Sequence, residues 1–166
     1  ETNHDIYALR LNQSGSYIGG SLMQVSTLGN NESHPAVVLN QESNEYLIVW
    51  EHLSGSGEFT HNDIRGQRVS GGGVKTGGAI IFDNSNRDES MPKAGYSSVS
   101  DKYLVVWQEK QPDTNGYDIH ARMMNTSGML YPAELTIASW ADYDLFKPDL
   151  AYNPVTDQFL VVWEDH

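Results

Sequence analysis

The chain has 166 residues, of which 39% are apolar, and a formal net charge of −12. This apolar content is enough to bury a core and argues against disorder. The acidity excludes nucleic acid and anionic membrane surfaces as natural partners, because both are negatively charged. No run of about eighteen apolar residues occurs, so no membrane span is predicted. Without cysteine there is no disulfide and no thiolate metal site.

One block of sequence occurs three times. Two copies are continuous, and the third begins at 148–166 and resumes at 1–15. The spacing from proline to tryptophan is fifteen in every copy: Pro35 to Trp50, Pro92 to Trp107, Pro148 to Trp163. The period, measured on the tryptophans, is 57 and then 56 (107−50, 163−107). Constant blocks joined by variable connectors are typical of an array of supersecondary units.

Each copy predicts four strands, and the chain begins with the third strand of the divided copy. In chain order the predicted strands are Asp5–Leu11, Leu22–Ser26, Ala36–Leu39, Tyr46–Trp50, Asp63–Val69, Ala79–Phe82, Lys93–Tyr96, Tyr103–Trp107, Asp118–Met124, Glu134–Ala138, Asp149–Tyr152 and Phe159–Trp163. The tryptophan strands are aromatic and mostly β-branched, which favours strands buried on both faces. A proline precedes each first strand and is expected at its start, where a missing N–H costs nothing.

Four antiparallel strands repeated about every 55 residues predict an all-β fold, a β-propeller. The blades are expected at 35–91, at 92–147, and at 148–166 together with 1–34. A β-sandwich has no reason to repeat its sequence so strictly, and a β-solenoid needs shorter rungs.

The motifs P-x-x-x-Y-N, D-x-[YF]-L-V-V-W-E-D and D-I-Y-x-x-R-L resemble tandem repeats of bacterial secreted and cell-surface proteins predicted to be β-propellers. The resemblance covers nearly the whole chain and is loosest in the fourth strand. Leu39 and Met123 depart from it. It implies a propeller in an extracellular or cell-surface location, and it implies no activity. The first residues lack both Met and an apolar stretch, so either a signal peptide has been removed or the chain is an excised piece.

The divided copy predicts an assembly. Three blades would turn 120° from one to the next, too far for sheets to pack face to face, and propellers typically have four to eight blades. Two chains related by a two-fold axis would form six blades, two of them composite. We therefore expect a strand-sharing homodimer that forms a six-bladed ring. The alternative is an excised part of a longer array.

Candidate ligand-binding residues lie where second strands end and third strands begin, a face built from loops. Glu51, Glu109 and Glu164 are expected there. The connector 139–146 carries Trp140 and Tyr143 among acids, a pattern able to stack on a sugar ring and bind its hydroxyls. The alternative for Trp140 is packing in the groove between blades.

No cofactor is predicted, although two loops, 83–89 and 113–118, offer oxygen ligands suited to Ca²⁺. The repeated tryptophans are expected to pack between blades rather than form a ligand cage. No G-x-S-x-G, H-E-x-x-H or phosphate-binding loop occurs.

The acids recur with the repeat, whereas an active site is normally asymmetric within a chain. We therefore expect a non-catalytic extracellular β-propeller module that binds a glycan or protein through its loop face or serves as a scaffold. The alternative is a glycoside hydrolase or lyase with an acidic central site.

Overall fold

The computed structural model describes residues 3–19, 22–111, 116–140 and 144–166. In this part of the chain the secondary structure consists of strands and turns. The strands are β1 (Ile6–Ala8), β2 (Met23–Ser26), β3 (Glu32–Asn40), β4 (Glu45–Ser56), β5 (Phe59–Ser70), β6 (Lys75–Asp83), β7 (Glu89–Ser97), β8 (Lys102–Lys110), β9 (Tyr117–Asn125), β10 (Leu130–Ala138), β11 (Leu145–Asn153) and β12 (Gln158–Asp165). Within the described ranges, no helix long and apolar enough to cross a membrane is found.

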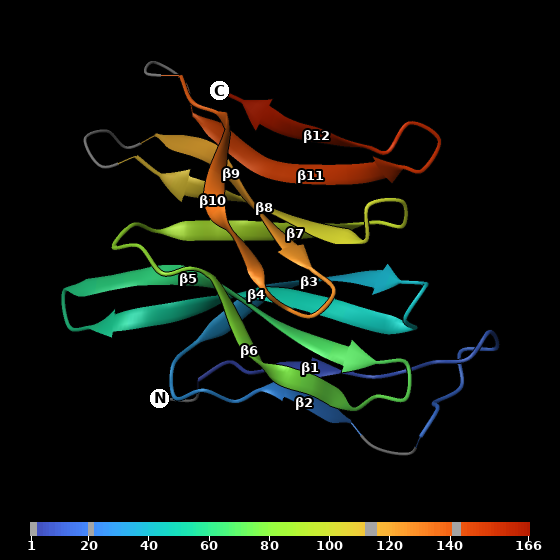
Figure 1. The fold of residues 1–166 in the computed structure, drawn as a ribbon. Helices are drawn as coiled ribbons and strands as arrows, with labels where there is room; N and C mark the ends of the chain where they lie inside the picture. The colour runs from blue at the N-terminus through green and yellow to red at the C-terminus, as the bar shows by residue number, and fades with distance from the viewer. Residues whose placement is uncertain (1–2, 20–21, 112–115, 141–143) are drawn as a thin grey trace.

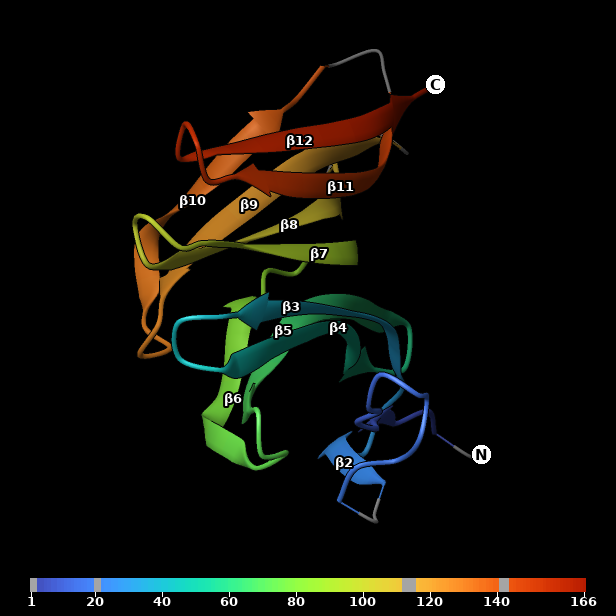
Figure 2. The same cartoon turned by 90° about the vertical axis from the view of Figure 1, so that its right-hand side faces the viewer.

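The strands form four antiparallel sheets. Two are four-stranded, with the orders β3-β4-β5-β6 and β7-β8-β9-β10, and two are two-stranded, β1-β2 and β11-β12. Figures 1 and 2 show the sheets stacked one above another, with the two-stranded sheets at opposite ends of the stack. The predicted all-β fold of antiparallel four-stranded sheets is confirmed.

A bulge, and not a strand start, explains the repeated proline. β3, β7 and β11 each begin three residues before it (35−32, 92−89, 148−145). The residue before each proline has a positive φ, 50° at His34, 55° at Met91 and 50° at Lys147. The pairing register shifts at the same place in all three strands. A bulge leaves one residue unpaired, so proline's missing N–H is harmless there too.

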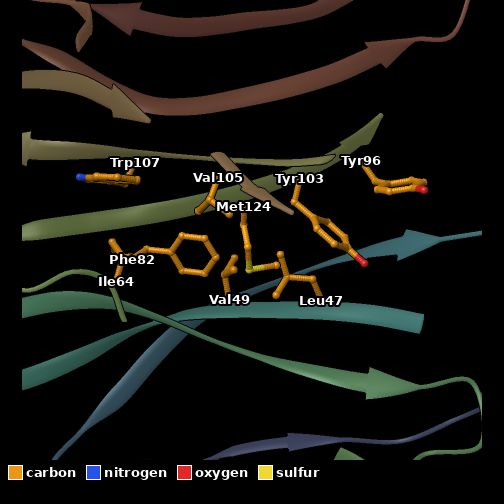
Figure 3. Close-up of a cluster of buried hydrophobic side chains, with 9 residues drawn as sticks. All are labelled: Leu47, Val49, Ile64, Phe82, Tyr96, Tyr103, Val105, Trp107 and Met124. Carbon is orange, nitrogen blue, oxygen red and sulfur yellow. The ribbon is translucent and has the colours of Figure 1, made fainter. Parts of the chain in front are cut away.

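The main core fills the gap between the two four-stranded sheets. Leu47, Val49, Ile64 and Phe82 from the first sheet meet apolar side chains of the second (Figure 3). Those partners are Tyr96, Tyr103, Val105, Trp107 and Met124. Trp107 therefore packs between sheets, as the sequence predicts.

Close packing also dictates a glycine. A Cβ on Gly66 would lie 2.8 Å from Cε2 of Phe82, closer than real side-chain contacts. The first sheet therefore needs glycine in β5 so that the Phe82 ring can lie flat over the strand.

Phenylalanine provides a matched test of this core. Phe82 is fully buried, whereas Phe59 is 85% exposed in the β4–β5 hairpin. We expect Phe82→Ala to cost about 3–5 kcal/mol of unfolding free energy, through lost burial and a residual cavity. Phe59→Ala should change it by less than about 0.5 kcal/mol. Urea unfolding of both variants makes the comparison, and equal losses would contradict this assignment of the core.

Candidate functional site

Five ionisable side chains from five strands converge near the connection from β6 to β7. They are Asp83 of β6, Glu89 of β7, Glu109 of β8, His120 of β9 and Glu134 of β10. Carboxylate oxygens of the first three lie within 4.8 Å of one another, and so do ligand atoms of the last three. We call these five residues the acidic junction.

The ladder of the second sheet places these side chains on one face. Glu89 pairs directly with Glu109 across β7 and β8, and Trp107 pairs with His120 across β8 and β9. Trp107 and Glu109 are two residues apart and therefore share a face. The Trp107 and His120 rings stack, with centroids 6.5 Å apart. This face points toward the first sheet, which contributes Asp83.

Hydrogen bonds tie most of the junction together. The backbone N–H of Ser85 donates to Asp83 at 2.6 Å, and its hydroxyl donates to Oε1 of Glu89 at 2.6 Å. Arg87 forms an ion pair with Glu109. Nδ1 of His120 is paired with Oε1 of Glu134. Oε2 of Glu89 is buried without a hydrogen-bond partner among the described residues.

Crowding of acids in a buried place shifts their titration. Burial raises the pKa of the Glu89 carboxyl to about 9, and the charges of Asp83 and Glu109 add to the effect. Burial likewise raises the pKa of Glu134, helped by a hydrogen bond with Asp83. At neutral pH Glu89 therefore holds a proton. Perturbed carboxyl groups of this kind concentrate at functional sites.

The acidic junction occurs in only one of the three described repeats. In the repeat of the first sheet, the positions of Asp83, Glu89, Glu109 and His120 are occupied by a mixed set of residues, which are Ser26, Glu32, His52 and Arg65 in that order. In the repeat that begins with β11, the positions of Asp83 and Glu89 are occupied by the apolar residues Ala138 and Leu145. In the mixed set Glu32 lies beside His52 and accepts a hydrogen bond from the Ser26 hydroxyl. The acidic junction therefore has Asp83 where the first repeat has Ser26, Glu109 where it has His52, and His120 where it has Arg65. This difference between otherwise similar repeats favours a function for the residues of the acidic junction.

Oxygen ligands in this arrangement could hold a divalent cation. Asp83 and Glu89 end one of the two loops predicted to suit Ca²⁺, and with Glu109 they offer three carboxylates within 4.8 Å. Of the second predicted loop, Asp113 lies outside the described residues.

The structure separates the predicted glutamates. Glu109 lies in the acidic junction. Glu51 is buried, and it accepts hydrogen bonds from the Ser33 hydroxyl at 2.9 Å and from the backbone N–H of Met91 at 2.7 Å. Glu164 is exposed and pairs with Lys147 at 2.9 Å. Glu51 thus links two sheets, and Glu164 occupies the equivalent position on the outermost strand.

Trp140, one of the predicted aromatic residues, follows β10 at the same end of the second sheet as Glu109 and His120, because Ala138 pairs with Ile119 near the start of β9. Trp140 is about half exposed and meets Trp163 edge to face, with ring centroids 6.1 Å apart. Phe146, at the end of the same connector, makes a second aromatic pair with Tyr117, with ring centroids 5.5 Å apart. Tyr143 lies outside the described residues. Trp140 therefore packs on one side against Trp163 and leaves about half of its surface exposed to solvent.

Comparison with known proteins bears on the fold. A scan against protein-family models and a search of curated proteins find no match. Among solved structures, the chain is similar to an endo-arabinase from Bacteroides thetaiotaomicron VPI-5482, with a TM-score of 0.55 and 11% identity over 92% of this chain and 57% of that one. It is also similar to a thermostable family-43 glycoside hydrolase, with a TM-score of 0.60 and 10% identity over 96% and 61%. Both likenesses support a β-propeller fold.

These likenesses overturn the prediction of a non-catalytic module, since both matched structures are glycoside hydrolases. The acids also do not simply recur with the repeat, because the acidic junction occurs in one of the three described repeats. The chain spans about three fifths of the length of the matched structures.

The raised pKa of Glu89 has a measurable consequence. Its pKa is about 9 in the folded chain against an ordinary 4.5, so folding favours the protonated form and this contribution is lost as pH rises from about 4.5 to 9. Relative to Glu89→Gln, the wild type should lose up to about 1.4 kcal/mol of stability per pH unit in this window. Urea unfolding at pH 5, 7 and 9 measures the difference. Glu58→Gln, the same change on the exposed β4–β5 hairpin, is the control, and a pH-independent difference for Glu89→Gln would contradict the assignment.

Proposed function

We propose that the chain is a glycoside hydrolase domain whose acid–base chemistry is carried by the acidic junction. The observation that carries the proposal is the convergence, in one repeat only, of several carboxyl groups, of which two have a raised pKa. Glycosidic bonds are hydrolysed by pairs of carboxyl groups, one protonated and one ionised. The likeness to two glycoside hydrolases supports the same activity.

Glu134 is the proposed proton donor. It is the most exposed member of the junction, and burial raises the pKa of its carboxyl group, which favours the protonated form that a general acid needs. Its carboxyl hydrogen passes to the glycosidic oxygen as the bond from that oxygen to the anomeric carbon breaks. His120 is paired with Glu134 and positions its carboxyl group.

Glu109 is the proposed carboxylate on the other side of the bond. One of its oxygens lies within 4.8 Å of the nearest Glu134 oxygen, near the separation of about 5–5.5 Å used by enzymes that retain anomeric configuration. It would form an ester with the anomeric carbon. Water would then cleave that ester, giving its proton back to Glu134. The Arg87 guanidinium supplies a counter-charge to the Glu109 carboxylate.

Glu89 would serve the pair without touching substrate. Being protonated, it removes one negative charge from the buried side of Glu109. If Glu89 were ionised as well as Asp83, two further negative charges would lie beside Glu109, and they would oppose the loss of the proton from Glu134. Glu89 is thus a positioning residue for the charge balance of the junction.

Activity can be tested by the release of reducing ends from polysaccharides. Arabinan is the first substrate to try, because one matched structure is an endo-arabinase, and a panel of xylan, galactan and pectin widens the test. We expect Glu134→Gln to lower the rate at least about 100-fold because it removes the general acid. Glu109→Gln should lower it at least about 100-fold because it removes the nucleophile. Glu42→Gln, an exposed turn residue, should leave it unchanged.

Products distinguish hydrolysis from elimination. A hydrolase releases saturated ends that lack absorbance at 235 nm, whereas a lyase creates an unsaturated ring that absorbs there. If both glutamine variants keep the wild-type rate, the acidic junction does not carry the reaction. An unsaturated product would show that the chain cleaves by elimination and not by hydrolysis.

We also propose that the ring is completed by a second copy, giving six blades, with the blades at 35–91, at 92–147 and at 148–166 combined with 1–34 of the partner. The open two-stranded sheets at both ends of the stack support this proposal. The resemblance to secreted bacterial repeats supports an extracellular or cell-surface location, where polysaccharides are met.

Mass in solution tests this assembly. A closed pair of chains has twice the mass of one chain of 18.5 kDa. Light scattering over a hundredfold range of concentration should give the doubled mass throughout. A mass of one chain across that range would contradict the ring.

A further inference from the structure

Equivalent side chains on the three tryptophan strands have very different exposures. Leu47 of β4 and Leu104 of β8 are 0% and 5% exposed, but Leu160 of β12 is 68% exposed. Val49 and Val106 are both 0% exposed, but Val162 is 52% exposed. The period of 57 and 56 makes these trios equivalent. The face of β12 that carries Leu160 and Val162 is therefore apolar, by repetition of a buried pattern, and uncovered in one chain. We call it the β12 face.

The two buried equivalents show what covers such a face. Leu47 and Val49 pack on Tyr103 and Val105 of the next sheet. Leu104 and Val106 pack on Phe159 and Val161 of the sheet after that. The partner is thus always the opposite face of the next tryptophan strand. By the same rule, the β12 face needs Tyr46 and Ile48, which are equivalent to Tyr103 and Val105.

Those residues line an open apolar cavity at the far end of the stack. The cavity has a volume of about 460 Å³, and Tyr46, Ile48 and Val69 form one of its walls. Ile6 and Met23, from the β1-β2 sheet, lie on another. Ile6 is equivalent to Ile64, and Ile48 is equivalent to Val105. In the core between the four-stranded sheets, Ile64 and Val105 belong to one cluster with Leu47 and Val49. The described cluster around Ile6 and Ile48 contains no leucine or valine in the places of Leu47 and Val49, and the cavity lies there.

A polar contact repeats in the same way. The residue after each tryptophan accepts a hydrogen bond from the N–H of the bulge residue in the next sheet. Glu51 accepts from Met91 at 2.7 Å, and Gln108 accepts from Lys147 at 2.8 Å. The next members of the two series are Glu164 and His34. His34 has the same positive φ as the other bulge residues.

One chain cannot make these contacts with itself, because its two-stranded sheets lie at opposite ends of the stack (Figure 1). Both halves of the contact are nevertheless present on every chain. We infer that the β12 face of one copy packs into the cavity lined by Ile6, Tyr46 and Ile48 of a second copy, with Glu164 accepting a hydrogen bond from the His34 N–H of that copy. The inference rests on the proposed ring closure and adds the contact that produces it.

The strand register follows from the complete sheets. Glu109 pairs with Asp118 and Trp107 with His120 across β8 and β9, and His52 pairs with Asp63 across β4 and β5. The equivalent pairing sets Asp165 of β12 opposite Asp5 of the partner's β1. Directly opposed residues of an antiparallel pair have Cα atoms about 4.5–5.5 Å apart, which lies within the roughly 4.4–6.8 Å that a disulfide spans.

The first experiment removes the apolar contact. Leu160→Asp combined with Val162→Asp places two charges in the cavity, and the dissociation constant of the dimer should rise at least 100-fold by analytical ultracentrifugation. Val155→Asp, a change on a 90% exposed turn residue, should leave it unaltered. Since each copy carries a net charge of −12, the wild-type dimer should also tighten as salt is added. A wild-type dimer that both aspartates leave intact would overturn the contact.

The second experiment tests register and remains informative where aspartate disturbs folding. The chain has no cysteine, so Asp5→Cys with Asp165→Cys introduces one designed pair. Oxidation by copper phenanthroline should join two copies through two disulfides, each formed from two thiols with transfer of two electrons to the oxidant. His4→Cys with Asp165→Cys, slipped by one residue, should cross-link at least tenfold more slowly. Equal cross-linking of both pairs would overturn the register.

These outcomes are separable from the proposals on which they bear. A monomeric wild type removes both ring closure and the contact. A dimer insensitive to both variants leaves ring closure standing and removes the contact. Hydrolysis is decided independently by the glutamine variants of the acidic junction.

Discussion

Every blade of this chain depends on the next one, because its apolar faces are covered only by a neighbouring sheet. A four-stranded sheet with hydrophobic residues on both faces has no stable existence in water alone. The core of Leu47, Val49, Phe82, Tyr103 and Val105 shows how one gap is filled. The repeat then requires similar filling at each further gap. The stacking of the sheets follows from that requirement, and the proposed assembly extends it to the ends of the chain.

The acidic junction is a local departure from this rule. Around β11 the equivalent place holds Ala138 and Leu145 in a small apolar cluster. At the junction, carboxyl groups occupy a buried place where apolar residues would be more stabilising. Glu89 alone is held protonated against its ordinary tendency to ionise, at a cost to stability near neutral pH. Residues kept at such a cost are best explained by a function, and the proposed acid–base role gives them one.

The sequence predicts the strands and much of their environment, because a repeated block reveals periodicity three times over. It predicts the burial of Trp50 and Trp107 for the same reason, whereas Trp163 on the outermost strand is only partly buried. It misplaces Pro35, Pro92 and Pro148, since a bulge and a strand start both tolerate a missing N–H. It singles out Glu109 and the loop 83–89, but it does not predict that they meet His120 and Glu134, because the members of the junction are spread over about fifty residues and meet only when five strands align. Alignment of the repeats carries a signal, the exchange of Ser26 for Asp83 and Arg65 for His120, but its meaning depends on burial that only the structure shows.

Amide hydrogen exchange along β12 tests the central claim most directly, namely that every blade is completed and covered in solution. β12 has one hydrogen-bonded neighbour in a single chain, whereas the equivalent β8 has two. The account predicts that amides of Phe159–Trp163 exchange as slowly as those of Tyr103–Trp107, within about tenfold. Exchange on the outward edge of β12 at the rate of a frayed strand would contradict it.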